Sequence, residues 1–195
     1  MNTQSFRLWN LDLCQDMPKQ ISSTGIVAVR GDITRIGTFL RENFPNFAEE
    51  SQGVISSERI KRSKQIYLCG ESDLIELQLD NKTIGIFVGA AEDWSSYYVR
   101  MFAIMPQYQT AHMIRRFIRE CLFTPMTEAG VERISADTSP VNVAMTHLFG
   151  ELKFYLTGSS LSDRWGPLAR YTKFLNQANE EVFLRRFGVG GIIAA

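Results

Sequence analysis

Thr83-Ile-Gly-Ile-Phe-Val-Gly-Ala-Ala91 opens the stretch that decides the fold, and it reads as an apolar strand. The next strand ends in Phe102-Ala-Ile-Met-Pro-Gln-Tyr-Gln109 and runs into a basic amphipathic helix. A third strand, Val131-Glu-Arg-Ile-Ser-Ala-Asp-Thr-Ser-Pro140, precedes Asn142, which opens a short helix ending in Leu148-Phe-Gly-Glu-Leu-Lys-Phe154. This order of strands and helices predicts a mixed sheet with helices on its faces.

The region before this stretch adds strands and helices of its own. Leu74 to Leu79 alternates apolar and polar residues, which predicts a half-buried strand paired through the turn Asp80-Asn81-Lys82. Ile26 to Arg30 reads as a short strand. Asp32 is a good N-cap for a helix over Ile33 to Asn43, which Phe44-Pro45 ends. We expect a further helix from Ser56 or Ser57 to about Leu68.

The helix after Gln109 carries apolar residues on one face and arginines on the other, and Pro125 is expected to bend or end it before Gly130. After Phe154 the pattern predicts a strand, a Gly/Ser-rich loop around Ser159 to Gly166, and a strand over Ala169 to Leu175. Asn176 to Phe187 reads as a helix.

Composition narrows the class of protein. The chain has 195 residues, 22.2 kDa and a formal net charge of zero, so nothing global favours binding to nucleic acid or to a membrane surface. No segment approaches the length of a membrane span, and the first twenty residues lack the pattern of a signal peptide. Cys14, Cys69 and Cys121 lack metal-ligand spacing. We therefore expect a cytoplasmic protein without a metal.

The order of elements from Gly25 to Leu175 resembles the GNAT superfamily of acyl-coenzyme A-dependent N-acyltransferases. The resemblance implies an α/β (α+β) fold with a single mixed, mostly antiparallel sheet flanked by helices. It divides the chain into an N-terminal segment (1–24) that packs on the domain or on a partner, a GNAT-like domain (25–175), and a C-terminal helix and tail (176–195). It implies transfer of an acyl group from an acyl thioester to an amine on a small molecule or peptide.

The resemblance also assigns the donor site. Phe102, Ala103 and Ile104 correspond to the strand that splays from its neighbour, here near Ala103, and exposes backbone amides to the pantetheine arm. The family's phosphate loop, in which helix N-terminal amides bind the diphosphate, corresponds to Gln109, Thr110, Ala111, His112, Met113 and Ile114. His112 and Ile114 replace two small residues, and the β-branched Ile114 is expected to crowd a diphosphate. The donor is therefore acyl-coenzyme A or the acyl-phosphopantetheine of an acyl carrier protein.

The catalytic groups depart from the family pattern. Asn142 matches a cofactor-binding Asn, but Phe149 stands where the family often has a Tyr that protonates the leaving thiolate. His147 is the nearest substitute acid, although its spacing points it to another helix face. Tyr98 falls near the position of the family's general base, and a phenol is a poor base at its usual pKa of about 10. Glu92, Asp93 and Asp137 are further candidates near strand ends.

Arg115, Arg116 and Arg119 form a basic stripe that resemblance places beside the phosphate end of the donor. It is expected either to be a solvated helix face or to contact the 3′-phosphate of coenzyme A or an acyl carrier protein. Because the altered loop and the missing Tyr both weaken the match, two alternatives stay open. One is an inactive GNAT-fold binding or regulatory module, and the other is a GNAT-like thioester hydrolase or decarboxylase.

Overall fold

The computed structural model describes residues 11–45, 70–162 and 165–187 of the chain. These residues form one sheet whose strands are β1 (Lys19–Gln20), β2 (Val27–Arg30), β3 (Ser72–Leu79), β4 (Lys82–Ala91), β5 (Ser96–Ile104), β6 (Arg133–Thr138), β7 (Tyr155–Ser162) and β8 (Gly166–Phe174). The helices are α1 (Ile33–Asn43), the 3₁₀ turn η1 (Pro106–Tyr108), α4 (Ala111–Phe117), the π-helical turn η2 (Ile118–Phe123), α5 (Thr124–Glu128), α6 (Val143–Glu151) and α7 (Gln177–Phe187).

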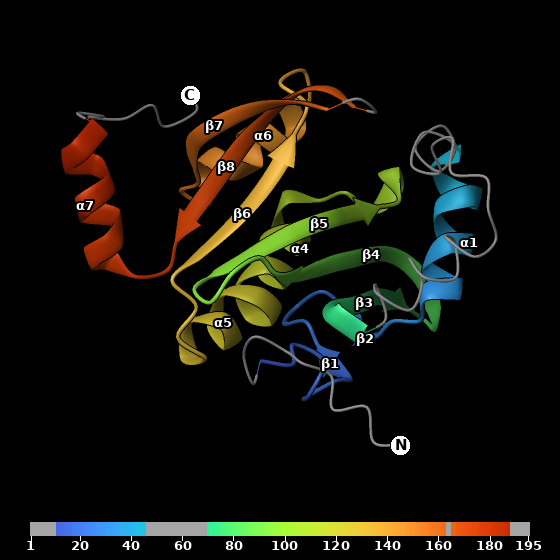
Figure 1. The fold of residues 1–195 in the computed structure, drawn as a ribbon. Coiled ribbons are helices and arrows are strands. Elements are labelled where there is room, and N and C mark those ends of the chain that lie inside the picture. Colours follow the sequence, from blue (N-terminus) through green and yellow to red (C-terminus); the bar gives the residue numbers. More distant parts are fainter. Residues whose placement is uncertain (1–10, 46–69, 163–164, 188–195) are drawn as a thin grey trace.

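The eight strands lie in the order β1-β2-β3-β4-β5-β6-β8-β7 (Figure 1). Every neighbouring pair is antiparallel except β5 and β6, which are parallel. A parallel pair needs a crossover connection, and α4, η2 and α5 supply it. The predicted fold class is confirmed: one mixed, mostly antiparallel sheet flanked by helices.

Two local signals produce the expected geometry. The carboxylate of Asp32 accepts the backbone N–H groups of Thr34 and Arg35 at 2.9 and 3.1 Å, and so caps α1. Asp80 and Asn81 adopt left-handed φ angles of 49° and 62°, which is the geometry of the tight turn that joins twisted β3 and β4. Short polar side chains tolerate this conformation, so the hairpin is encoded locally.

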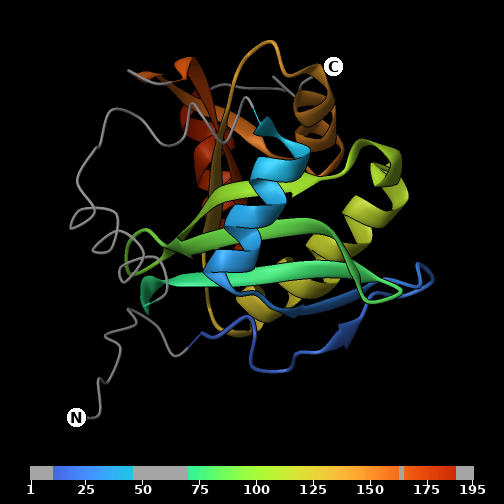
Figure 2. The ribbon, with the colours of Figure 1, turned by 90° about the vertical axis from the view of Figure 1, so that its right-hand side faces the viewer.

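Helices cover both faces of the sheet (Figure 2). α1 lies across β3 and β4 on one face, over a cluster of six buried residues: Ile36, Phe39, Leu40, Leu74, Ile86 and Val88. On the other face, α4, η2, α5 and α6 cover a larger core that includes Phe87, Tyr97, Phe117 and Ile134. The open part of the α1 face lies over β5, β6 and β8, between α1 and α7 (Figure 1).

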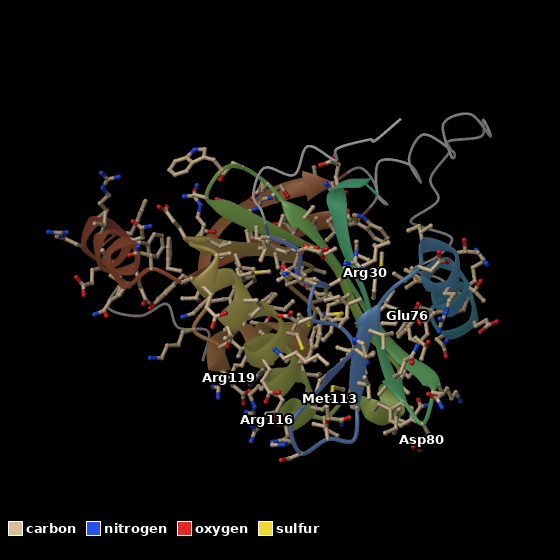
Figure 3. All side chains as sticks on the ribbon, turned by 90° about the horizontal axis from the view of Figure 1, so that it is seen from below. Arg30, Glu76, Asp80, Met113, Arg116 and Arg119 are labelled. Atoms are coloured by element: carbon tan, nitrogen blue, oxygen red, sulfur yellow. The ribbon has the colours of Figure 1, made fainter. Side chains whose placement is uncertain are left out.

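β3 is buried on both faces, so the prediction of a half-buried strand is wrong. Glu76, the polar residue of its alternation, has no exposed surface because α1 covers it. Its carboxylate pairs with the guanidinium of Arg35 at 2.8 Å and accepts the hydroxyl of Thr83 at 2.9 Å. Glu76 thus lies between the sheet and α1 (Figure 3). The alternating sequence pattern predicts a side chain in contact with water, and the ion pair with Arg35 takes the place of that hydration.

The central helix passes through Pro125 and continues to Glu128. Proline has no N–H to donate, and the turn before it is π-helical. The backbone N–H and the hydroxyl of Thr124 both bond to the carbonyl of Arg119, the hydroxyl at 2.9 Å. The helix ends before Gly130, whose φ is 78°.

The first described residues follow one of the two expected placements, whereas most of the Gly/Ser-rich loop expected after Phe154 is strand. Ile21 is fully buried and β1 pairs with β2, so residues 11–24 pack on the domain. β7 extends to Ser162 through the predicted Gly/Ser-rich loop and pairs with β8. The helix expected over residues 56–68 lies outside the described residues. Among the described helices, none is long and apolar enough to cross a membrane.

Candidate functional site

β5 and β6 separate partway along the sheet, as predicted. Their register runs from Ser96↔Arg133 to Val99↔Ala136 and then stops, although β5 continues to Ile104. The separation thus begins after Val99, earlier than the expected point near Ala103. The β4–β5 register shifts at the same level, which makes Arg100 the extra residue of a β-bulge. A bulge bends its strand and increases its twist, and this is the physical reason that β5 leaves β6 here.

The separated part of β5 presents backbone groups toward the gap in the pairing. Met105 donates its N–H to the carbonyl of Ile84 on β4 at 2.9 Å. Because successive residues of a strand direct their backbone groups to opposite sides, the groups of Phe102 and Ile104 point to the β6 side, where the register supplies no partner. Ala103 points its backbone groups toward β4, so its predicted contact with a cofactor through backbone amides is wrong.

The loop between β5 and α4 is fixed to the end of the strand. Gln109 donates its side-chain amide to the carbonyl of Ile104 at 2.7 Å. This side chain therefore orients the loop, and one of the backbone acceptors beside the gap is already occupied. Among the residues that the structure describes, none is assigned as a partner of the N–H of Phe102, its carbonyl or the N–H of Ile104.

α4 begins immediately after this loop. Thr110 is its N-cap and accepts the N–H of Met113 at 3.3 Å, and the side chain of His112 is exposed. The first turn of a helix leaves N–H groups without intrahelical partners, and these attract anions. Met113 is buried and Ile114 packs against the larger core. The packing of Ile114 removes the basis for the expectation that its β-branched side chain crowds a diphosphate.

The basic stripe on α4 and η2 is partly neutralised within the chain. Arg115 pairs with Glu151 at 2.8 Å, and Arg116 pairs with Glu120 at 3.3 Å. Burial alone raises the pKa of Glu120, but hydrogen bonds from Ser22 and from Arg116 outweigh it and leave this pKa lowered. Arg119 is exposed and, within the described part of the chain, has no ion pair (Figure 3).

α6 separates the three residues that the sequence assigned to it. Asn142 is exposed and caps the helix by accepting the N–H of Met145 at 3.2 Å. His147 is exposed on the same helix. Phe149 is 5% exposed, and its ring centroid lies 4.9 Å from those of both Phe154 and Tyr171. Phe149 is a core residue, so its assignment as a cofactor contact is wrong; the helical period turned it inward while it turned His147 outward.

The open face of the sheet carries a polar network beside the point where β5 leaves β6. Arg170 on β8 donates Nε and Nη2 to the two carboxylate oxygens of Asp137 on β6 at 2.9 and 3.1 Å. Its third nitrogen bonds to Glu92 at 3.1 Å, and Ser135 donates its hydroxyl to Glu92 at 2.9 Å. Tyr98 donates its hydroxyl to Asp137 at 3.2 Å.

Tyr98 is the member of this network that the sequence named as a base. Burial, together with the negative charge of Asp137 and the hydrogen bond to it, raises the pKa of Tyr98 to about 12. A phenol with so high a pKa stays protonated near neutral pH and serves as a hydrogen-bond donor. The geometry of Tyr98 is that of a residue that holds the Asp137 carboxylate, and its role as a general base stays a prediction.

Arg170 was missed in the sequence, although it contacts both carboxylates of the network. Asp137 is 11% exposed and Arg170 is 42% exposed, so this is a half-buried bidentate pair. Asp137 and Glu92 share the guanidinium of Arg170, and Arg100 acts electrostatically on Tyr98 of the same network. The alternation of Arg133, Ser135 and Asp137 was the available signal, because it places all three on one polar face.

Folding also brings together Asp12, Cys14 and Asp73, whose ligand atoms lie within 4.8 Å of one another. Arg30 pairs with Asp12 at 2.8 Å. The Sγ of Cys14 donates to the carbonyl of Leu74 at 3.4 Å, and the hydroxyl of Tyr97 donates to Asp73 at 2.9 Å. The guanidinium already supplies positive charge to this buried group, which has the character of a structural network.

Comparison with solved structures identifies the fold. An acetyltransferase from Salmonella typhimurium that modifies the N-terminal serine of ribosomal protein L7/L12 matches at TM-score 0.58 and 13% identity, over 79% of this chain and 97% of that one. A spermidine N-acetyltransferase chimera from Vibrio cholerae and hSSAT matches at 0.60 and 14%, over 80% and 99%. A GNAT family acetyltransferase from Elizabethkingia anophelis with acetyl-CoA bound matches at 0.55 and 11%, over 77% and 99%.

These likenesses show that the chain has the GNAT fold. No family model matches the sequence, and no curated protein matches it.

Proposed function

We propose that the protein is an N-acyltransferase that moves an acyl group from an acyl thioester to an amine. The observation that carries this proposal is the separation of β5 from β6, which turns the N–H groups of Phe102 and Ile104 toward a gap beside the start of α4. The unpaired edge of β5 can form hydrogen bonds with the amide groups of a pantetheine arm, as it would with a neighbouring β-strand. A solved structure of the same fold holds acetyl-CoA.

The donor end of the site is formed by β5 and by the loop before α4. Phe102 and Ile104 bind the pantetheine arm, and the first N–H groups of α4, near Ala111 and His112, receive its phosphate. The exposed ring of His112 and the exposed side chain of Asn142 are available beside them. We propose acyl-coenzyme A as the donor, with the phosphopantetheine of an acyl carrier protein as the alternative source of the same thioester.

The acceptor end is the network of Glu92, Asp137 and Arg170. Its two carboxylates lie at the open face, where they can receive an ammonium group and one of them accepts the first proton that this group loses. The neutral amine nitrogen then attacks the thioester carbonyl and forms a carbon–nitrogen bond. The tetrahedral intermediate collapses as the carbon–sulfur bond breaks, and the second proton of the nitrogen passes to the departing sulfur or to water, which leaves a neutral amide. Tyr98 positions the Asp137 carboxylate during these steps.

The departing thiolate finds no acid at Phe149, which lies in the core. A thiol with a pKa of about 8.5 needs little assistance near neutral pH, so transfer proceeds without that residue. His147 stays a predicted proton donor. The core position of Phe149 also favours a second candidate function, a module that binds the thioester without transferring its acyl group.

The proposed acceptor is an amine on a small molecule or a peptide, which agrees with the ribosomal protein and spermidine named for two matched enzymes. If the donor is a carrier protein, Arg119 is the cation of the basic stripe that is available for it, because Arg115 and Arg116 are paired. A cytoplasmic location follows from this chemistry and stays part of the proposal.

One experiment separates transfer from binding. Purified protein is incubated with acetyl-coenzyme A and a panel of amines and short peptides, while thiol release and the mass of each acceptor are followed. Transfer requires equal amounts of free thiol and acetylated acceptor. Binding of acetyl-coenzyme A without acetylated product supports the module, and thiol release without acetylated product supports a hydrolase. Arg170→Met should abolish transfer, because it removes the guanidinium that Asp137 and Glu92 share. Arg30→Met, which removes the ion pair of β2 with Asp12, should retain it.

A further inference from the structure

An open pocket of about 700 Å³ lies on the same face of the sheet as Arg170, between the strands and α7. Its floor is lined by the hydroxyl side chains of Ser96, Ser135, Thr157 and Thr172. Thr157 and Thr172 share a hydrogen bond of 2.8 Å across β7 and β8. A volume of this size is typical of sites for small ligands or short peptide segments.

One face of α7 forms the opposite wall. The lining residues of this helix follow helical spacing: Asn179, Val182, Phe183, Arg186 and Phe187. The ring of Phe183 lies 5.1 Å from that of Phe174 and 5.5 Å from that of Tyr155. Tyr155 also donates its hydroxyl to Glu180 at 2.7 Å. These contacts attach α7 to the sheet, so the wall has a fixed orientation.

Two ion pairs line the pocket, and among the described residues Glu132 and Arg186 are the charged lining residues outside these pairs. Asp93 pairs with Arg133 at 3.3 Å, and Glu92 pairs with Arg170 at 3.1 Å. Arg186 has no ion pair with any residue that the structure describes.

Glu132 does not balance Arg186. Its carboxylate accepts the side-chain amide of Asn179 at 3.1 Å, at the beginning of α7. Asn179 and Arg186 are seven residues apart, and a helix rises about 10 Å over that interval. The end of the wall near Arg186 is therefore positively charged, with the apolar Val182, Phe183 and Phe187 beside it.

We propose that this pocket binds the acceptor and that Arg186 binds a carboxylate carried by that acceptor. The part of this pocket in a reaction rests on the proposed acyl transfer. Arg170 connects the pocket to that reaction, because it lines the pocket and also bonds to Asp137. A guanidinium binds a carboxylate through two parallel hydrogen bonds, and the apolar residues of α7 pack against the stem that joins the carboxylate to the amine. The acceptor class is thus an amine with an acidic group, such as a peptide that has a free amino terminus and an acidic residue among its first three.

The test is the binding of two tripeptide amides with free amino termini, Ala-Ala-Glu and Ala-Ala-Gln, measured by calorimetry on the full chain. The acidic peptide should bind about fivefold more tightly than the neutral one, as expected for a partly exposed ion pair. Arg186→Gln should remove this preference. Arg185→Gln is the matched control, because Arg185 carries the same charge on the adjacent position of α7 and does not line the pocket. It should retain the preference.

Equal binding of the two peptides to the wild-type chain, or binding of neither, would overturn the proposal, as would a preference that survives in Arg186→Gln. Both variants should melt at the wild-type temperature by circular dichroism, because both side chains are exposed. Binding does not depend on transfer, so the two proposals fail separately. A preference for the acidic peptide without acetyl transfer would support the acceptor pocket and contradict the proposed acyl transfer. Transfer to both peptides at equal efficiency would support acyl transfer and contradict the proposed role of Arg186.

Discussion

Arg170 is predicted to contribute more to stability than other paired arginines of this chain. Arg170→Met keeps much of the apolar stem but removes two hydrogen bonds to Asp137, at 2.9 and 3.1 Å, and one to Glu92 at 3.1 Å. Asp137 is 11% exposed and retains the hydroxyl of Tyr98 as a donor.

The magnitude follows from burial. Removing one partner of a fully buried pair costs about 3 to 5 kcal/mol, because the remaining charge is left unpaired. Arg170 is 42% exposed, so water screens part of this interaction and we expect a loss of about 2 kcal/mol. Arg115→Met is the control: it breaks a pair of the same kind at 2.8 Å whose side chains are 36% and 48% exposed, and should cost about 0.2 to 1 kcal/mol.

The assay is urea unfolding of both variants and the wild type, at low salt and in about 1 M NaCl. Salt of this strength screens exposed charges over about 3 Å, so the small loss in Arg115→Met should disappear while most of the loss in Arg170→Met persists. Equal losses in the two variants, or a loss in Arg170→Met that vanishes in salt, would refute the half-buried network that is assigned to the acceptor site.

Three further predictions concern single side chains. A Cβ on Gly89 would lie 2.5 Å from the Cε1 and hydroxyl atoms of Tyr97, so Gly89→Ala should destabilise by about 1 to 3 kcal/mol in chemical unfolding. Gly37→Ala, whose Cβ would make an ordinary contact of 3.5 Å with the Arg41 side chain within α1, should be neutral or stabilise by up to about 1 kcal/mol. Phe149→Tyr should lower stability by about 1 to 3 kcal/mol without raising turnover, because it places a hydroxyl in the core; faster thiol release would show instead that this residue faces the thioester. With its pKa raised to about 12, Tyr98 stays protonated from about pH 6 to about pH 10, so Tyr98→Phe should leave the shape of the pH–rate profile unchanged, and loss of a basic limb would contradict this.

Sequence reasoning succeeded where neighbouring residues determine the structure. Asp32 caps α1 through bonds to residues two and three positions away, and Asp80 and Asn81 form the turn by their own conformations. The separation of β5 from β6 was also predicted, although only from resemblance. Its position was wrong because the bulge at Arg100 depends on the pairing of β4 with β5, which no local pattern reports.

Residues whose surroundings come from distant segments were interpreted less well. Glu76 looked exposed because α1 was not yet placed over it, and Phe149 looked like a site residue because its contacts with Tyr171 cross from α6 to β8. Arg170 bonds to a carboxylate 78 positions earlier in the chain. Neither the composition nor the residue spacing predicts that contact, because it depends on the order of the strands in the sheet.

The most direct test of the account is amide-resolved NMR of the ¹⁵N-labelled protein during titration with acetyl-coenzyme A. If the gap between β5 and β6 holds the thioester donor, the largest shifts and the largest gains in hydrogen-exchange protection should occur at the N–H groups of Phe102 and Ile104, followed by those of Ala111 and His112. The N–H of Ala103, which points toward β4, should change less than its two neighbours. Saturable binding that leaves Phe102 and Ile104 unperturbed, or the absence of binding at millimolar acetyl-coenzyme A, would contradict the proposed donor site.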